Sequence, residues 1–296
     1  MTSQASIGHS LPQAVMFGVG AAVVLPVMDG MVKSLASIYP IILIAWWRFA
    51  IMSTVLLTLI GRGKSWSQFK TNAPGLQLLR ALMVVAATSC FYTGLRQLPL
   101  AECTAIMFLS PAFSAVLGFL WLRERPSLLG WIVILMSVIG VLLVTGPFSK
   151  HFEVTKLIVM IGALTHALFT LLTRMLAPID VPRVTTFWSS LGTLLAFSLV
   201  VPQYWETPHN PDHVLLLLCI GLLGTVGQLL FSQAFRHGYT HVIAPLSYLS
   251  LPTALLIGLI VFGERMDIYS LIGIGLILLS AALVALGHTT RSKVAP

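Results

Sequence analysis

The chain has 296 residues, of which 57% are hydrophobic and 9% are charged, and its mean hydropathy is +0.95. Because a soluble domain carries about 25% charged residues, this composition excludes a water-exposed surface and indicates a protein embedded in lipid. The formal net charge of +8 is accounted for by basic residues at the ends of apolar segments, so we expect no nucleic-acid partner.

Apolar segments separated by short polar or Pro-rich stretches predict about ten transmembrane helices of roughly 20 residues each. In chain order they are expected at 13–36, 40–60, 74–97, 100–121, 127–146, 154–177, 182–202, 213–236, 240–262 and 267–288. The predicted fold class is therefore an all-α integral membrane protein, with tails at 1–12 and 289–296. The first apolar segment is too long for a cleavable signal peptide, and residues 1–12 contain no Lys or Arg.

Basic residues are divided unevenly between the two ends of these helices. The set that faces the cytoplasm when the N-terminus is inside outnumbers the other by about two to one. It consists of Arg62, Lys64, Lys70, Arg123, Arg125, Arg174, Arg183, Arg236, Arg291 and Lys293. The opposite set consists of Lys33, Arg96, Lys150, Lys156 and Arg265. This bias predicts a multi-pass membrane protein with both termini in the cytoplasm.

The second half of the chain repeats the pattern of the first half after a shift of about 140 residues. The matching pairs include Leu109 with Leu249, Ser110 with Ser250, Gly118 with Gly258, and Glu124 with Glu264. The two repeats are expected at 13–146 and 154–288. Since each repeat holds five helices, an odd number, the second must begin on the opposite side of the membrane. The sequence therefore predicts two inverted repeats around a central cavity.

Each repeat contains a span that ends in a Glu-Arg pair before the next apolar span. The two segments are Leu122-Arg123-Glu124-Arg125 and Phe262-Gly263-Glu264-Arg265. In this feature the chain resembles EamA-type members of the drug/metabolite transporter superfamily. Members of that family often carry a glycine about nine residues after this Glu. Gly273 fits that pattern in the second repeat, whereas the first repeat has Val133 at the corresponding position. Length and character look most like the YddG-type amino-acid exporters. The resemblance implies ten helices around a central cavity, alternating access and export of the solute.

His166 is an ionisable residue about twelve residues into its predicted helix, roughly 18 Å from the helix start and so near the middle of the bilayer. Phe169, Thr170 and Thr173 share its helix face. Because ionisable groups at this depth usually serve function, we expect His166 to line the cavity and contact the solute. The alternative is a neutral histidine bonded to a neighbouring helix.

Polar and aromatic residues also occupy equivalent positions of two pairs of repeat-related helices. An inverted-repeat transporter binds its solute near the midplane, where the repeats meet, so these residues are the expected binding site beside His166. For each of them the alternative is hydrogen bonding between helices. The set is Thr88, Tyr92, Phe108, Gln228, Ser232, Ser247 and Tyr248.

The other charged residues favour structural roles. All acidic residues lie at span ends or in loops except Asp29, which is about two turns from an end, so the sequence offers no candidate for an intramembrane carboxylate relay. Arg48 and Arg80 are expected to extend toward the membrane interface. Glu124 and Glu264 are expected to cap or pair at helix junctions.

Proline and small residues inside the spans bear on helix shape and packing. Pro26, Pro111, Pro245 and Pro252 each free a backbone carbonyl upstream, which either bends the helix or accepts a hydrogen bond from an ammonium group. Small residues on 127–146 and 267–288 pack the two halves together or form a homodimer, and a monomer is equally compatible. They are Gly130, Gly140, Gly273, Gly275 and Ser280.

These features favour a secondary transporter that exports small neutral or zwitterionic metabolites, with amino acids, including aromatic and other apolar ones, as the expected class. Nucleosides or cationic compounds are the alternative solutes. We expect no enzyme activity, cofactor or metal, and the partners are the solute and the lipid bilayer. The rival interpretation is a membrane enzyme acting on lipid-linked substrates. Its nearest support is the loop carrying His209, Asp212 and His213, where Pro211 interrupts regular spacing.

Overall fold

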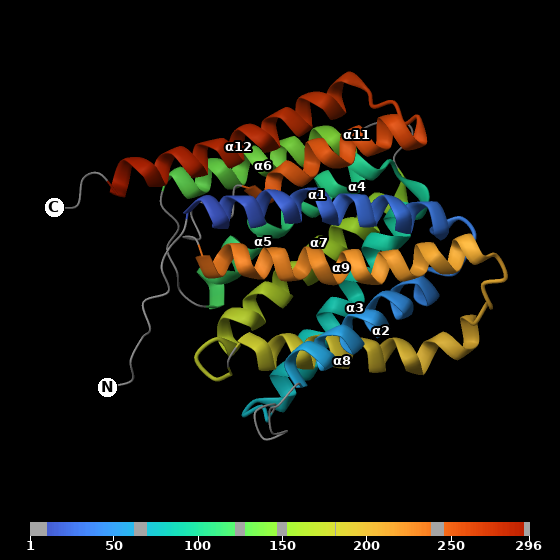
Figure 1. Ribbon diagram of the computed structural model, residues 1–296. Helices are drawn as coiled ribbons and strands as arrows, with labels where there is room; N and C mark the ends of the chain where they lie inside the picture. The colour runs from blue at the N-terminus through green and yellow to red at the C-terminus, as the bar shows by residue number, and fades with distance from the viewer. Residues whose placement is uncertain are drawn as a thin grey trace.

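The computed structural model describes residues 11–61, 70–121, 128–146, 153–180, 182–237 and 246–292, and these form a bundle of helices (Figure 1). The helices of the N-terminal half are α1 (Leu11–Ala36), α2 (Ile41–Gly61), α3 (Pro74–Gln97), α4 (Leu100–Met107), α5 (Leu109–Trp121) and α6 (Leu128–Thr145). Those of the C-terminal half are α7 (Val154–Leu176), α8 (Pro182–Val200), α9 (Pro211–His237), α11 (Ser250–Phe262) and α12 (Ile268–Ser292), with 3-10 turns η2 (Val201–Tyr204) and η3 (Ser247–Leu249). No strand occurs in the described ranges, which agrees with the all-α prediction.

Seven helices are long and apolar enough to cross a membrane, and three shorter apolar helices lie among the described residues at 130–145, 247–262 and 268–280. Large apolar side chains such as Leu199, Ile260 and Leu120 are 82%, 77% and 65% exposed on the outside of the bundle. A water-soluble protein does not leave so many apolar side chains uncovered, so the outer surface of this bundle faces lipid.

Two predicted helices are interrupted where proline requires it. The span expected at 100–121 breaks at Phe108 into α4 and α5, and the span expected at 240–262 opens with η3 before α11. Pro111 and Pro252 lack the N–H groups that would bond the carbonyls of Met107 and Tyr248, four residues earlier. These interruptions agree with the bending expected at prolines inside the spans, while the stretch 238–245 lies outside the described residues.

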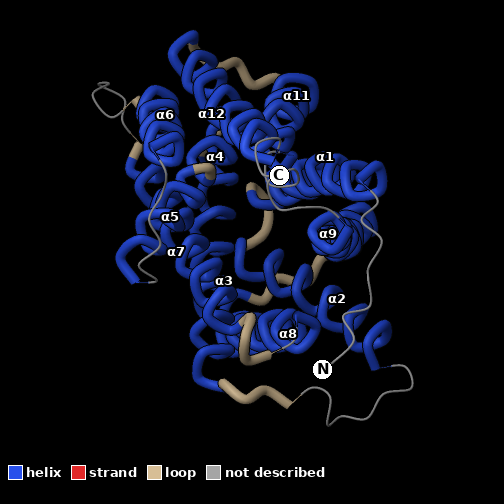
Figure 2. Tube along the Cα trace, turned by 90° about the vertical axis from the view of Figure 1, so that its left-hand side faces the viewer, coloured by secondary structure: helices blue, strands red, loops and turns tan. Residues whose placement is uncertain are grey.

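Helices α6 and α12 lie side by side in both views (Figure 1, Figure 2). A Cβ atom on Gly140 would come within 2.8 Å of the Gly273 carbonyl oxygen, and the Ser137 and Ser280 hydroxyls hydrogen-bond at 3.0 Å. The sequence left two roles open for the small residues of these helices, contact between the halves or a homodimer. Gly140, Gly273 and Ser280 join the two halves within one chain. Homodimer formation remains an untested expectation.

Gly273→Ala is expected to destabilise the protein by about 1–3 kcal/mol, because the added methyl meets the Gly140 carbonyl oxygen and Val144. The measurement is the midpoint of thermal unfolding in detergent. Gly275→Ala, two residues away, is the matched control: a Cβ there meets nothing within 4 Å, and alanine favours the helix. Equal midpoints for both variants would contradict the close packing of α6 on α12.

Candidate functional site

The ends of the bundle differ in packing, and we name them by the chain termini. The proximal end holds the start of α1 and the end of α12, and the distal end holds Ala36 and the start of α12 (Figure 1). The large buried core gathers in the distal half, where Leu35, Leu95 and Leu100 are at most 1% exposed. The second buried cluster, around Ala14 and Ala234, is small and lies in the proximal half.

Near the middle of the bundle, two of the predicted site residues meet. Phe108, at the break between α4 and α5, stacks on Tyr248 of η3 with ring centroids 4.5 Å apart and planes 19° from parallel. These two positions correspond in the repeat, so the proline breaks place equivalent aromatic side chains face to face. Stacked rings of this kind give the site a flat apolar wall.

His166 of α7 lies beside the same junction. Its Nδ1 is 2.9 Å from the hydroxyl of Ser110, which lies in the first turn of α5, and its ring is 5.6 Å from that of Phe169. The side chain is exposed, yet it points away from the helix face that carries the lipid-facing Leu157 and Ile161. Solvent therefore reaches His166 from inside the bundle. The contact with Ser110 is the hydrogen bond to a neighbouring helix given above as the alternative, and it leaves the imidazole accessible.

Gln228 and Ser232 of α9 form a second polar group. Both side chains are exposed. Gln228 lies on the side of α9 away from Val226, which is 45% exposed toward lipid, whereas Ser232 lies on the flank of the helix, about a quarter turn from Leu222. Viewed from the proximal end, α1 and α9 lie across the bundle from α3, α5 and α7 (Figure 2). Exposed polar side chains therefore lie on inward-facing parts of α7 and α9, from the middle of the bundle toward its proximal end.

The remaining predicted residues lie deeper. Tyr92 is fully buried and Thr88 is 9% exposed, whereas Ser247 is half-buried within η3. The Tyr92 hydroxyl accepts a hydrogen bond of 2.9 Å from Arg48 Nη1. Tyr92 is thus placed to hold Arg48 rather than to present its own ring to the interior.

Both membrane arginines depart from their predicted positions. Arg80 donates to Thr173 Oγ1 at 2.8 Å and to the Thr185 carbonyl at 2.8 Å, and lies 4.3 Å from the centroid of Phe169. Arg48 points inward to Tyr92. The expectation that these side chains extend to the interface was wrong, because residues on neighbouring helices accept hydrogen bonds from both of them inside the bundle.

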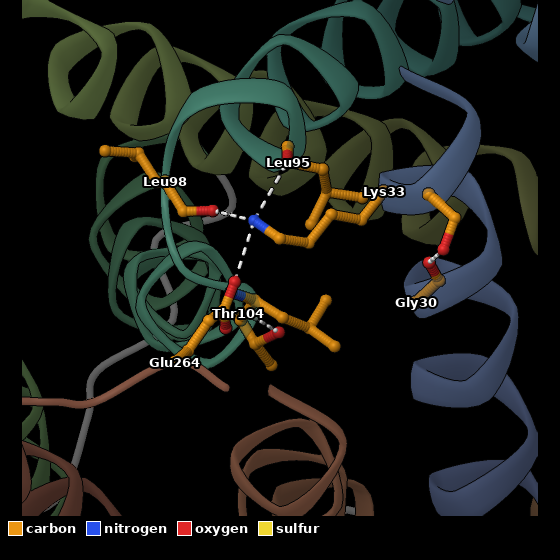
Figure 3. A network of polar contacts seen from close by, with 8 residues as sticks. Gly30, Lys33, Leu95, Leu98, Thr104 and Glu264 are labelled. Carbon is orange, nitrogen blue, oxygen red and sulfur yellow. Dashed lines mark hydrogen bonds and ion pairs between the residues drawn. The ribbon is translucent and has the colours of Figure 1, made fainter. Parts of the chain in front are cut away.

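The distal end is closed by a network around Lys33 (Figure 3). Lys33 Nζ is 2.9 Å from Glu264 Oε1 and donates to the carbonyls of Leu95 at 3.2 Å and Leu98 at 2.5 Å. Glu264 Oε2 also accepts from the Leu100 amide at 2.9 Å. This network, which we call the distal latch, joins α1, the α3–α4 corner and the end of α11. The prediction that Glu264 pairs at a helix junction is confirmed, whereas Glu124 lies outside the described residues.

A second ion pair lies at the same end. Lys156 Nζ of α7 is 2.6 Å from Glu102 Oε1 of α4 and donates to the Thr145 carbonyl at 3.1 Å. It ties the start of the C-terminal half to α4 and α6. The distal end therefore has two charged ties over a packed core.

The loop that gave most support to an enzyme does not assemble a metal site. His213 Nδ1 is 2.9 Å from the Tyr39 hydroxyl, and the two rings meet edge to face at 5.5 Å, while His209 is exposed. Within the described ranges, no group of three His, Cys, Asp or Glu side chains could hold a metal ion.

This architecture defines a class: a multi-pass helical membrane protein with polar side chains on inward-facing helix surfaces and charged ties at its distal end. The EamA-like transporter family matches residues 12–146 and 155–286, and the chain belongs to that family. Every relative named below is a transporter, which agrees with the expectation that the chain is not an enzyme.

Relatives with known names carry different solutes. The riboflavin transporter of Vibrio cholerae is 25% identical over 293 residues, 97% of this chain and 98% of that protein. The S-adenosylmethionine uptake transporter of Rickettsia conorii is 25% identical over 76% of each chain. The pseudopaline exporter CntI of Pseudomonas aeruginosa is 26% identical over 95% of this chain and 98% of its own. A crystal structure with a TM-score of 0.68 and 16% identity, covering 92% of this chain and 97% of its own, shares the fold.

Glu264→Gln is expected to loosen the distal latch, because removing one member of a charged hydrogen bond costs about 2 kcal/mol. The reporter is Cys103, which is fully buried in α4, in a variant whose Cys90 and Cys219 are replaced by alanine. Its reaction with maleimide in detergent should accelerate several-fold.

Arg265→Gln, an exposed charge next to the latch, serves as the control and should leave that rate unchanged. Unchanged labelling of Cys103 in the Glu264 variant would show that the latch does not restrain the distal end.

Proposed function

We propose that this protein is a secondary transporter that exports small zwitterionic metabolites, with amino acids as the leading class, by alternating access. The observation that carries the proposal is the contrast between the two ends of the bundle. A packed core and the distal latch close one end, while exposed polar side chains occupy inner helix faces toward the other. A protein that opens one end at a time moves solutes without forming a continuous pore.

The side chains of the open half support a small solute with an apolar part. Phe108 and Tyr248 offer stacked rings, and His166, Gln228 and Ser232 offer accessible polar groups. Such a mixture of aromatic surface and scattered hydrogen-bonding groups suits small, net-neutral molecules. We place the proximal end in the cytoplasm of a bacterial cell, because most basic residues gather there, so the shape described corresponds to a cytoplasm-facing state.

Two inverted five-helix repeats, 13–146 and 154–288, are the moving parts in this proposal. Two contacts mark where the halves join: the repeat-equivalent residues Phe108 and Tyr248 stack, and Gly140 packs on Gly273. Rocking of one half against the other about these contacts would exchange the open end for the closed one.

A second class of solute also has support. The relative from Vibrio cholerae is named for riboflavin and that from Rickettsia conorii for S-adenosylmethionine uptake, so neither amino acids nor export follows from family membership. A nucleoside or a cationic compound with a flat ring would likewise suit the stacked pair of Phe108 and Tyr248.

Purified protein in liposomes should take up labelled neutral amino acids with saturable kinetics, and collapse of an imposed pH gradient should leave the initial rate unchanged. Protein-free liposomes and labelled nucleosides are the controls. Flux of a nucleoside or drug with none for any amino acid would overturn the substrate class. Loss of amino-acid flux without the pH gradient would overturn transport without proton coupling.

His166→Ala and Tyr248→Ala should each lower the initial rate of transport at least tenfold, because they remove an accessible polar group and half of the stacked pair. Membrane expression and the thermal midpoint should stay close to wild type. Thr54→Ala is the matched control, since Thr54 is exposed and bonds only its own helix through the Ala50 carbonyl at 2.8 Å. Wild-type rates in both variants would place the site elsewhere.

A further inference from the structure

Asp29 and Arg48 lie at the same depth of the membrane on two different helices. Asp29 is seven residues before the end of α1 and Arg48 is seven residues after the start of α2, so each lies about 10 Å inside the distal end at 1.5 Å per residue. The depth of Asp29 agrees with the sequence analysis. Its position beside an inward-pointing arginine is a feature that the sequence did not predict.

The carboxylate of Asp29 makes no polar contact with the described residues. The residue is half-buried on the inner face of α1, the face that also carries Lys33, one turn toward the distal latch. Within the described part of the chain, no hydrogen bond is formed by its carboxylate and no ion pair shorter than 4 Å reaches it. A Cβ atom on Gly224 of α9 would come within 3.0 Å of Met28 Sδ and 3.1 Å of Arg48 Nε. Arg48 therefore lies against the turn of α1 that carries Asp29.

Arg48 is held in place by neighbouring side chains, but not all of its hydrogen-bond donors have a partner among the described residues. One of its donors, Nη1, bonds Tyr92, and its guanidinium carbon lies 5.4 Å from the ring of Phe49. Its Nε is buried and has no partner among the described residues. Gly224 of α9 leaves the space that the side chain occupies, since a Cβ there would come within 3.1 Å of that nitrogen. The sequence of α9 thus makes room for a charge that the helices do not fully compensate.

We propose that Asp29 and Arg48 form a charged subsite that binds a zwitterionic solute, with Asp29 accepting from its ammonium group and Arg48 donating to its carboxylate. A zwitterion brings one charge of each sign, so both members of the pair stay compensated in a low-dielectric interior. A solute with a single charge compensates one member and leaves the other exposed to repulsion or desolvation. The pair therefore selects for solutes that carry both charges.

This inference rests on the proposed function and extends it, because it assigns residues to the polar end of the solute. The subsite lies directly below the distal latch, at the closed end of the interior, while Phe108, Tyr248 and His166 lie nearer the middle. An amino acid would enter from the proximal end, with its charged groups leading and its apolar side chain trailing toward the stacked rings.

The test is binding to purified protein, measured by calorimetry with three probes of similar shape. They are leucine, which carries both charges, 3-methylbutylamine, which lacks the carboxylate, and 4-methylpentanoate, which lacks the ammonium group. Wild type should bind leucine at least tenfold more tightly than either singly charged probe. Asp29→Asn should weaken leucine and the amine at least tenfold and spare the acid. Arg48→Gln should weaken leucine and the acid and spare the amine.

The double variant Asp29→Asn with Arg48→Gln separates binding from folding. Each single variant leaves one charge of the pair without its opposite, which destabilises the protein. The double variant removes both charges, so its thermal stability should recover. Leucine binding should stay at least tenfold weaker than in wild type. Recovery of leucine binding in the double variant would overturn the inference and make the pair a structural one.

Two further outcomes distinguish this inference from the proposed function. If wild type binds neither leucine nor any other zwitterion, the proposed substrate class is wrong. If wild type binds leucine and the single variants lose all three probes equally, the class stands and the charged subsite is wrong. Asp212→Asn, an exposed acidic residue in the first turn of α9, is the control and should bind all three probes as wild type does.

Discussion

Charges inside this bundle are stable only where another helix supplies their partner, and much of the tertiary structure follows from that constraint. Lipid offers no hydrogen bonds, so an unpaired charge in the membrane is costly. Lys33 finds Glu264 and two carbonyls across three segments, and Arg80 finds Thr173 and the Thr185 carbonyl. Each such contact fixes how two or more helices are placed.

The same constraint explains why the two ends differ. At the distal end, ion pairs and a dense apolar core exclude water and join both halves of the chain. Toward the proximal end, polar side chains on inner faces, among them His166 and Gln228, remain exposed. A transporter needs two ends that differ in packing, because a bundle packed equally at both ends has no route for a solute.

Prolines set the geometry where the halves meet. Pro111 and Pro252 interrupt their helices near the middle of the bundle, and the residues beside the breaks, Phe108 and Tyr248, stack. The sequence revealed the prolines and the correspondence of the two aromatic residues. It gave helix bending as one of two roles for these prolines, because each removes a backbone donor from its span. Spatial contact between the two rings required the packed structure.

The sequence by itself determined that the chain is an all-helical membrane protein built from two similar halves, because composition and hydropathy decide which surfaces lipid accepts. It also picked out His166, as an ionisable residue near mid-depth, and Phe108 and Tyr248, as aromatic residues at equivalent positions of the two repeats. Only the tertiary structure turned Arg48 toward Tyr92 instead of the interface, and it buried Tyr92. Those outcomes depend on which helices lie next to each other, and helical periodicity within one segment carries no information about its neighbours.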